Sequence, residues 1–338
     1  MITRRRSFEI RLLSALLLTL LCLGCTSPAT PGSGQSAATL QSAAKLQSAA
    51  KLQSPANWQS PLHQDHALVG KIWLPAENQF ISRDGLLLRL ASHPLLLLGE
   101  KHDNPDHHRL RLELLKDLIS PDSNSLLVLE MMTRDQQPAI ERLTGTSLPT
   151  ESDSLVSQLA WDTDGWPWQF YGPAVMLAFE RDVQLRAGNI NTGDVMQIYQ
   201  DDTPHNSQPL NTRQIAQLER DIDSSHCGML PSSQFPAMVR VQQTRDQQMS
   251  TALLPGDDVF DQRILLAGNY HIRHDLGVPN YLSQRPLSVA FLEVDPEYTA
   301  PAPYSQAFSE TLPYDVIWFT PALRQNDYCA DMRATQAR

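Results

Sequence analysis

Two short loops of one pattern, a glycine followed three residues later by a histidine, carry the residues best suited to chemistry. Gly99-Glu100-Lys101-His102 follows the apolar run 95–98, and Gly268-Asn269-Tyr270-His271 follows the apolar run 264–267. Each run is typical of a buried strand, and ligands bind at the carboxyl ends of strands in open α/β sheets. We therefore expect His102 and His271 to share one site, which either holds a cofactor or performs catalysis.

Carboxylates accompany these histidines. Glu100 lies inside the first loop, and Glu130 closes the next apolar run, 126–131. A buried carboxylate without a partner is costly, so Glu130 either orients a histidine or binds an ion. An ion pair with Arg134 is the simpler alternative. A water activated by a metal or by a carboxylate base would make a hydrolytic site from Glu100, His102, Glu130 and His271.

An aromatic segment forms a third candidate. Residues 161–171 contain Trp161, Trp166, Trp168, Phe170 and Tyr171. So many large rings either build a core or face a flat ligand. Tyr171 is of special interest because phenolate is an established ligand of haem iron.

The elements around the first loop alternate between strand and helix. Residues 107–119 have the apolar spacing of an amphipathic helix, with Asp103 or Asn104 as its cap and Pro105 in its first turn. The strand 126–131 and a helix at 136–143 follow. This βαβ order and the continuous apolar strands predict a parallel sheet covered on both faces.

The other elements complete an α/β fold. We expect an edge strand at 67–74, a helix at 83–91, and further strands at 183–190, 263–267, 287–294 and 314–319. Residues 212–254 have helical character, within a small inserted helical subdomain near 205–255. The prediction is a parallel or mixed sheet with helices on both faces plus this smaller subdomain.

The beginning of the chain has the pattern of an export signal. Arg4-Arg5-Arg6 precedes the apolar run 10–23 and Gly24-Cys25. We expect residues 1–24 to be a lipoprotein signal peptide, Cys25 to carry the lipid, and the outer membrane to be the destination. Residues 25–61 are rich in Ser, Ala and Gln and predict a flexible tether, which leaves 62–338 for the folded domain.

Charge and cysteine count narrow the function classes. The formal net charge of −10 over 338 residues, without a basic block, disfavours nucleic-acid binding. Four cysteines occur in the sequence. With Cys22 in the signal and Cys25 lipidated, Cys227 and Cys329 remain. In an oxidising compartment they predict one disulfide, with two buried thiols as the alternative.

Taken together, six ordered motifs resemble the ChaN-type haem-binding lipoproteins of bacterial haem-iron uptake. The resemblance covers most of the chain after the tether. The motifs are Gly99-Glu100-x-His102-Asp103-Asn104-Pro105-x-His107-His108, Glu130-Met131, Trp166-x-Trp168-x-x-Tyr171, His226-Cys227-Gly228-x-Leu230-Pro231, Gln243-x-Arg245-Asp246-x-x-Met249, and Gly268-Asn269-x-His271 with Gly277-Val278-Pro279.

The resemblance implies a binding protein rather than an enzyme. It implies ferric haem whose iron is held by a tyrosine, assigned to Tyr171 with Tyr270 as the second candidate. It also implies Lys101 and His226 near the propionates, with His102 and His271 as pocket groups. A homodimer formed on haem binding and an outer-membrane haem receptor are the implied partners.

The wider superfamily implies a catalytic function as the alternative. It includes Tiki-type metal-dependent proteases and erythromycin-esterase-like hydrolases, in which Glu100, His102, Glu130 and His271 would have catalytic equivalents. The alternative function is therefore a hydrolase or protease dependent on a divalent metal. A third hypothesis is an outer-membrane scaffold with a vestigial site.

Overall fold

The computed structural model of the chain describes residues 57–324 apart from 122, 148, 150, 202–208, 255, 257–258 and 307–311, together with residues 329 and 333. The predicted signal peptide at 1–24, the lipidation site Cys25 and most of the predicted tether lie outside the described residues. Among the described helices, none is long and apolar enough to cross a membrane.

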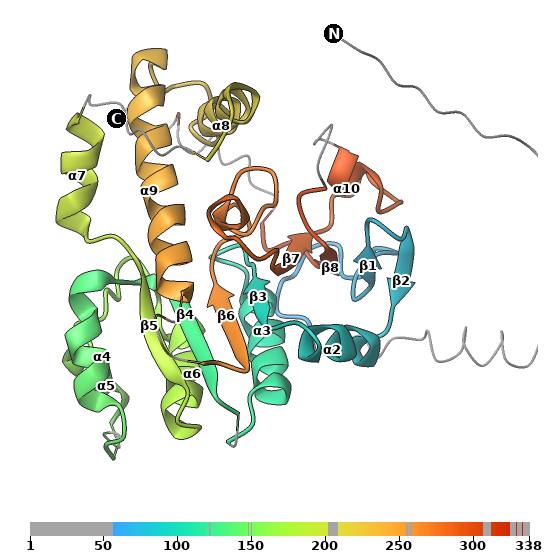
Figure 1. Ribbon diagram of the computed structural model, residues 1–338. Helices are drawn as coiled ribbons and strands as arrows, with labels where there is room; N and C mark the ends of the chain where they lie inside the picture. Colours follow the sequence, from blue (N-terminus) through green and yellow to red (C-terminus); the bar gives the residue numbers. More distant parts are fainter. Residues whose placement is uncertain are drawn as a thin grey trace, which may run out of the picture. The chain divides into compact units, whose positions relative to one another are not determined.

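Eight strands form one mixed sheet in the order β2-β1-β8-β7-β3-β6-β4-β5 (Figure 1). They are β1 (Ile72–Leu74), β2 (Gln79–Ile81), β3 (Leu95–Leu98), β4 (Ser125–Thr133), β5 (Gln184–Asn189), β6 (Gln262–Leu266), β7 (Leu287–Glu293) and β8 (Val316–Thr320). The strands from β8 to β5 along the sheet pair in parallel, whereas β1 runs antiparallel to both neighbours. The predicted α/β fold with a parallel or mixed sheet is confirmed.

The central strands are buried on both faces because successive side chains point to opposite sides. Leu96 and Leu98 of β3 belong to the core under α2 (Arg83–Ala91), α3 (Pro105–Leu118) and α6 (Trp168–Glu180). Leu95 and Leu97 belong to the opposite core, which α9 (Phe235–Leu253) covers. This double burial explains why the strands are uninterrupted apolar runs.

Two shorter helices, α4 (Gln137–Leu143) and α5 (Ser152–Gln158), lie between β4 and α6 in the chain, and a 3₁₀ turn at Arg134–Gln136 precedes α4. Helix α3 begins at Pro105, and the Asn104 side chain caps it by accepting from the backbone amides of Asp106 and His107. The helix follows the first glycine-histidine loop directly, so its cap fixes the position of that loop.

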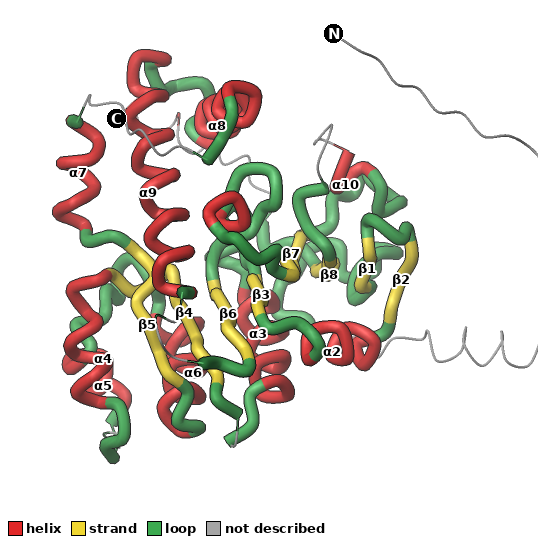
Figure 2. Tube along the Cα trace, in the orientation of Figure 1, coloured by secondary structure: helices red, strands yellow, loops and turns green. Residues whose placement is uncertain are grey.

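A helical section lies beyond the carboxyl ends of the strands. It consists of α7 (Thr192–Gln200), α8 (Thr212–Ser225) and the first part of α9. Figure 2 shows α8 beside the upper end of α9, above the strands. Leu218 and Ile222 of α8 pack with Val239 of α9 in a small separate core. The remaining elements are 3₁₀ turns at Ser232–Gln234 and Val278–Tyr281 and the short helix α10 (Pro303–Gln306).

The N-terminal part of the sheet differs from the prediction. Residues 67–74 were expected to form an edge strand, but β1 lies inside the sheet and β2 forms the edge. All three residues of β1 are buried, which is the pattern of an interior strand. Residues ahead of 62 also join the fold, because the amides of Gln59 and Ser60 donate to the Asp106 carboxylate.

Candidate functional site

The two glycine-histidine loops lie side by side, as their spacing predicts. Strands β3 and β6 are parallel neighbours, with Leu98 paired to Leu266. The loops stay paired beyond the strand ends, where the Asn269 amide donates to the Glu100 carbonyl at 2.8 Å. His102 and His271 therefore reach the same edge of the sheet from distant parts of the sequence.

Each glycine makes room for the other loop. A Cβ atom on Gly99 would lie 2.1 Å from Asn269 Oδ1 and 2.7 Å from Ile272 Cδ1. A Cβ atom on Gly268 would lie 2.9 Å from Nε2 of His102. A side chain at Gly99 would overlap Asn269 and Ile272, and one at Gly268 would displace the His102 ring, so the glycines permit the close approach of the loops.

Glu100 is the hub of the first loop. Its buried carboxylate accepts hydrogen bonds from Tyr171 Oη and His102 Nδ1, both at 2.8 Å. It also pairs with Arg111 and, at 3.0 Å, with His108. Burial alone would raise the pKa of Glu100, but the Arg111 and His108 charges hold it well below its usual range. Glu100 is therefore an anion that orients His102.

His271 of the second loop lies between two carboxylates. Its Nδ1 donates to Asp246 Oδ1 at 2.5 Å, and its Nε2 lies 3.2 Å from Glu130 Oε1. Burial would lower the pKa of His271, yet Glu130 and Asp246 raise it to about 10. Glu130 Oε2 also accepts from the Gly268 amide. The doubly held imidazolium thus fixes the loop to α9 and β4.

Glu130 therefore orients a histidine, one of the two roles predicted for it. The alternative ion pair with Arg134 is wrong, because Arg134 pairs with Asp194 at 2.6 Å. The reason is geometric: the Glu130 carboxylate is buried beside Gly268, whereas half of the Arg134 side chain is exposed.

A cavity of about 510 Å³ lies between these loops and α8. Its apolar walls come from Leu218 and Ile222 of α8 and from Phe291 and Leu292 of β7. The loops supply Glu100, Lys101, His102, Gly268, Asn269, Tyr270 and His271, and Asp221, Ser225, Gln242, Glu293 and Tyr314 complete the lining. The volume is in the range of small-molecule and cofactor sites.

Charged groups at the cavity are mostly paired. Lys101 Nζ lies 2.9 Å from Glu293 and 3.5 Å from Asp103. Arg273 Nη1 donates to Asp221 at 2.8 Å, and its guanidinium lies 5.2 Å from the centre of the Tyr270 ring. The lining thus combines apolar walls with a few oriented polar groups.

The candidate residues from the sequence are divided between the cavity and the core. Lys101, His102, Tyr270 and His271 line the cavity, and Tyr270 keeps 53% of its surface exposed. Tyr171 is only 1% exposed, and its ring meets those of His108, Trp161 and Trp166. The aromatic segment is thus mainly core, with Trp166 4.9 Å from the His102 ring.

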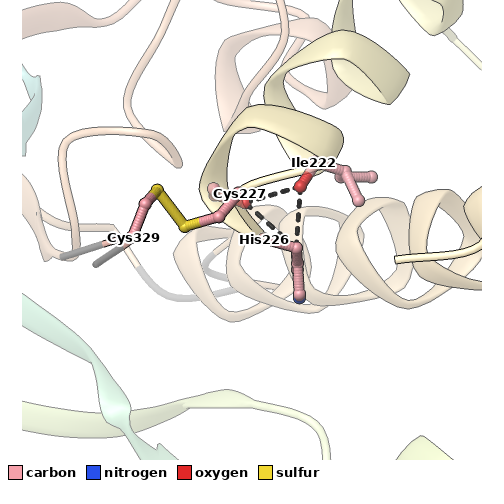
Figure 3. Close-up of a disulfide and its surroundings, with 5 residues drawn as sticks. Ile222, His226, Cys227 and Cys329 are labelled. Carbon is pink, nitrogen blue, oxygen red and sulfur yellow. Dashed lines mark hydrogen bonds between the residues drawn. A yellow bond between two sulfur atoms is a disulfide. The ribbon is translucent and has the colours of Figure 1, made fainter. Parts of the chain in front are cut away.

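His226 lies at the end of α8, outside the described cavity lining. Its Nδ1 donates to the Ile222 carbonyl at 2.7 Å. Figure 3 shows this contact beside the disulfide between Cys227 and Cys329, whose S–S distance is 2.04 Å. The disulfide joins the two cysteines that remain once Cys22 is assigned to the signal and Cys25 to the lipid. It holds the end of α8 in place.

Sequence reasoning missed several residues of the site. Glu293 ends the apolar strand β7, so the strand-end rule that drew attention to Glu130 in the sequence could have found it. In the structure Glu130 itself lies inside β4, which continues to Thr133. Arg273 lies two residues beyond His271 in a loop already singled out. Asp221 and Tyr314 could not be identified from the sequence, because no motif around either residue predicts that it lines the cavity.

Within the described part of the chain, no group of three or more His, Cys, Asp or Glu side chains is arranged to hold a metal ion. The histidines are instead paired with carboxylates. His102 and His271 each use Nδ1 for this contact. The site can therefore orient imidazoles, bind an apolar ligand and offer a phenol at its wall.

Comparison with known proteins identifies the family. Residues 86–282 match the family described as haem-binding uptake, Tiki superfamily, ChaN, and the chain belongs to this family. The match spans both glycine-histidine loops and ends before β7. No curated protein matches the sequence.

Among solved structures, the fold is similar to that of ChaN of Campylobacter jejuni, whose structure is described as showing cofacial heme binding. The identity is 22% and the TM-score 0.62, over 76% of this chain and 98% of that chain. The toxin effector domain RRSP of Vibrio vulnificus is 14% identical with a TM-score of 0.37, over 62% of this chain and 36% of that chain. The erythromycin esterase EreC is 14% identical with a TM-score of 0.38, over 62% of this chain and 72% of that chain.

Proposed function

We propose that the protein binds ferric haem in the cavity between the glycine-histidine loops and α8, as part of haem-iron acquisition. The observation that carries this is the cavity of about 510 Å³ with apolar walls and a half-exposed tyrosine. Membership of a haem-binding uptake family and the fold shared with the Campylobacter protein support it.

The lining fits the chemistry of haem. Leu218, Ile222 and Leu292 offer apolar contact to a macrocycle. Tyr270 and Tyr314 offer phenols, and Lys101 offers a cation at the rim. When bound, haem would supply a ferric iron that a phenolate can coordinate.

Tyr270 is our candidate for the iron ligand in preference to Tyr171. A ligand must reach the iron and lose its proton. Tyr171 is buried and donates its proton to Glu100 at 2.8 Å, and burial together with Glu100 raises its pKa far above the ordinary value. Tyr270 lines the cavity and keeps half of its surface exposed. Burial and the Asp221 charge raise the pKa of Tyr270 too, whereas the Arg273 charge beside it lowers the pKa.

For the propionates we propose Lys101. Its ammonium lies at the cavity edge, and its partners Glu293 and Asp103 would exchange with a propionate. His226 is the weaker choice because its Nδ1 is already bound to the Ile222 carbonyl. Replacing Lys101 by methionine should weaken haem binding several-fold with little change in the iron ligand spectrum.

We further propose that Cys25 carries a lipid anchoring the domain to the outer membrane, with residues 25–61 as the tether. Half of the Tyr270 surface is exposed, so a haem held by this residue would be accessible to another protein. A second copy or an outer-membrane haem receptor would cover that side. The cofacial haem binding named for the Campylobacter protein supports a dimer formed on haem binding.

The direct test is titration of the mature protein with ferric haem, followed by absorption spectroscopy and sedimentation. We expect a high-spin tyrosinate-type spectrum and a rise in mass from monomer to dimer. Tyr270→Phe should abolish the tyrosinate bands, whereas folded Tyr171→Phe should retain them. Loss of the bands in Tyr171→Phe alone would return the assignment to Tyr171, and bands in both variants would exclude either tyrosine.

A second candidate, hydrolysis, is favoured by the pairing of Glu100 with His102. The carboxylate holds Nδ1, and His102 lines the cavity, with its Nε2 beside Gly268. Such an imidazole can serve as a general base toward water. Uncharged chromogenic esters would test this: turnover that His102→Asn removes supports the candidate, and turnover equal in both proteins dismisses it.

A further inference from the structure

Arg273 is a buried cation beside the mouth of the cavity. It is 2% exposed, and its guanidinium is held on two sides. Nε and Nη2 donate to the two oxygens of Asp275 at 2.9 and 2.6 Å, and Nη1 donates to Asp221 at 2.8 Å. The position of the guanidinium is therefore fixed by a bidentate pair and a second carboxylate.

The Tyr270 ring rests on this fixed cation. The guanidinium carbon lies 5.2 Å from the ring centre, which is the geometry of a cation–π contact. Half of the Tyr270 surface is exposed, so few other contacts restrict the ring. The backbone on either side is already held, because the Asn269 amide donates to the Glu100 carbonyl and the His271 carbonyl accepts from the Val278 amide. What remains to be set is the direction of the side chain.

We propose that Arg273 is a positioning residue: it orients the Tyr270 phenol into the cavity and ties it to the opposite wall through Asp221. The inference rests on the proposed function in one respect, the use of Tyr270 as the haem ligand. An iron-bound phenolate would need a defined ring direction, and a guanidinium held by Asp221 and Asp275 against the Tyr270 ring supplies a fixed surface for it.

The connection to the opposite wall follows from the helix geometry. Asp221 lies on α8 with Leu218 and Ser225 at spacings of three and four residues, so the three share one face. All three line the cavity. The Arg273–Asp221 ion pair thus joins the loop that carries Tyr270 to the helix that carries the apolar wall. A shift of α8 would move the phenol.

The test compares Arg273→Gln with Arg285→Gln. Arg285 also pairs with an aspartate, Asp315, at 2.7 Å, but its side chain is 64% exposed. It is not among the described residues that line the cavity. We expect Arg273→Gln to lose haem affinity about tenfold and to shift the resonance Raman band of the iron-bound phenolate. In the haem-free protein, amides of residues 268–273 should exchange faster. Arg285→Gln should match the unaltered protein in all three measurements.

Two further variants guard against a simple folding defect. Arg273→Lys keeps the charge but cannot hold both aspartates with the same geometry, so we expect an intermediate affinity and band shift. Asp221→Asn keeps the Arg273–Asp275 pair and breaks the connection to α8, so we expect a smaller change in the same direction. A Raman band and affinity unchanged in Asp221→Asn would overturn the connection to α8.

The two proposals fail in different ways. If Tyr270→Phe removes the tyrosinate bands while folded Arg273→Gln and Arg273→Lys bind haem as the unaltered protein does, Arg273 has no positioning role and the haem proposal stands. If Tyr270→Phe keeps the bands, the ligand assignment and the role of Arg273 both fall.

Discussion

Glu100 shows how one residue organises the first loop. Its carboxylate has no exposed surface, and it holds the phenol of Tyr171, the imidazole of His102 and the guanidinium of Arg111 together. Such a charge is tolerated in the interior because every oxygen faces a donor or a cation. The two oxygens of the Glu100 carboxylate thereby connect the aromatic segment, the loop after β3 and helix α3.

Replacing Glu100 by glutamine should destabilise the protein by about 3–5 kcal/mol near neutral pH, because it leaves the Arg111 charge buried and unpaired. The pKa of Glu100 is lowered from 4.5 in the folded state, so its contribution is present above pH 4.5 and is lost as the pH falls toward the folded value. Urea unfolding of both proteins across this range measures the difference, which should narrow on acidification. A difference in unfolding free energy that does not change with pH would contradict the assignment of Glu100 as an anion.

At this scale the sequence predicts residue types better than residue partners. It placed His102, Glu130 and His271 at one edge of the sheet because strand ends can be read from apolar runs. It did not separate Tyr171 from Tyr270, since burial of a phenol depends on which face of α6 meets the sheet. Asp246 lies on α9, and its contact with His271 depends on helix placement that periodicity does not determine.

The pair of glycine-histidine loops acts as one element made from two segments. Each glycine accommodates a side chain of the other loop, Asn269 over Gly99 and His102 over Gly268. The side-chain amide of Asn269 also donates, through Nδ2, to the Phe291 carbonyl of β7 at 2.7 Å. Three neighbouring strands are thus held together beyond their ends.

Gly99→Ala should destabilise the protein by about 1–3 kcal/mol, because the new methyl group overlaps Asn269 and Ile272 in a packed region. The matched control is Gly193→Ala in α7, where nothing lies within 4 Å of the new Cβ atom. Alanine there should be neutral or stabilising by up to about 1 kcal/mol. Thermal unfolding of the two variants gives the comparison, and an equal effect would mean that the loops separate easily.

The strands and helices around the site were predictable because their apolar patterns are strong. Residues 95–98 form the expected strand, and α3 and β4 fall close to their predicted bounds. The stretch 212–254, predicted only to be helical, is divided into α8 and α9. The three-residue strand β2 was missed, because exposed Gln79 and Phe80 carry no alternation that marks a strand. Which strands become neighbours was beyond the sequence, apart from the pair of loops with the same pattern.

For the molecule as a whole, the disulfide closes a large part of the chain. Cys227 at the end of α8 is bound to Cys329, 102 residues further along. Between them lie α9, β6, β7 and β8, which include two walls of the cavity. A crosslink over such a span restricts the unfolded chain strongly.

The variant with Cys227 and Cys329 both replaced by serine should unfold more easily by about 2–5 kcal/mol. Guanidinium unfolding of the oxidised protein, the reduced protein and the serine variant measures this loss. The reduced protein should resemble the serine variant, and reductant should have no effect on the variant. If all three unfold alike, the crosslink contributes nothing to stability.

The reciprocal fit of the two loops has a kinetic consequence. The Gly268 amide meets Glu130 across 138 residues of sequence, and Lys101 meets Glu293 across 192. Contacts of such long range form late, because the intervening chain must be ordered first. Since a chain is made from its N-terminal end, the first loop waits through most of synthesis for its partner. Ligand-binding competence should therefore appear in a single late step, after β7 is in place.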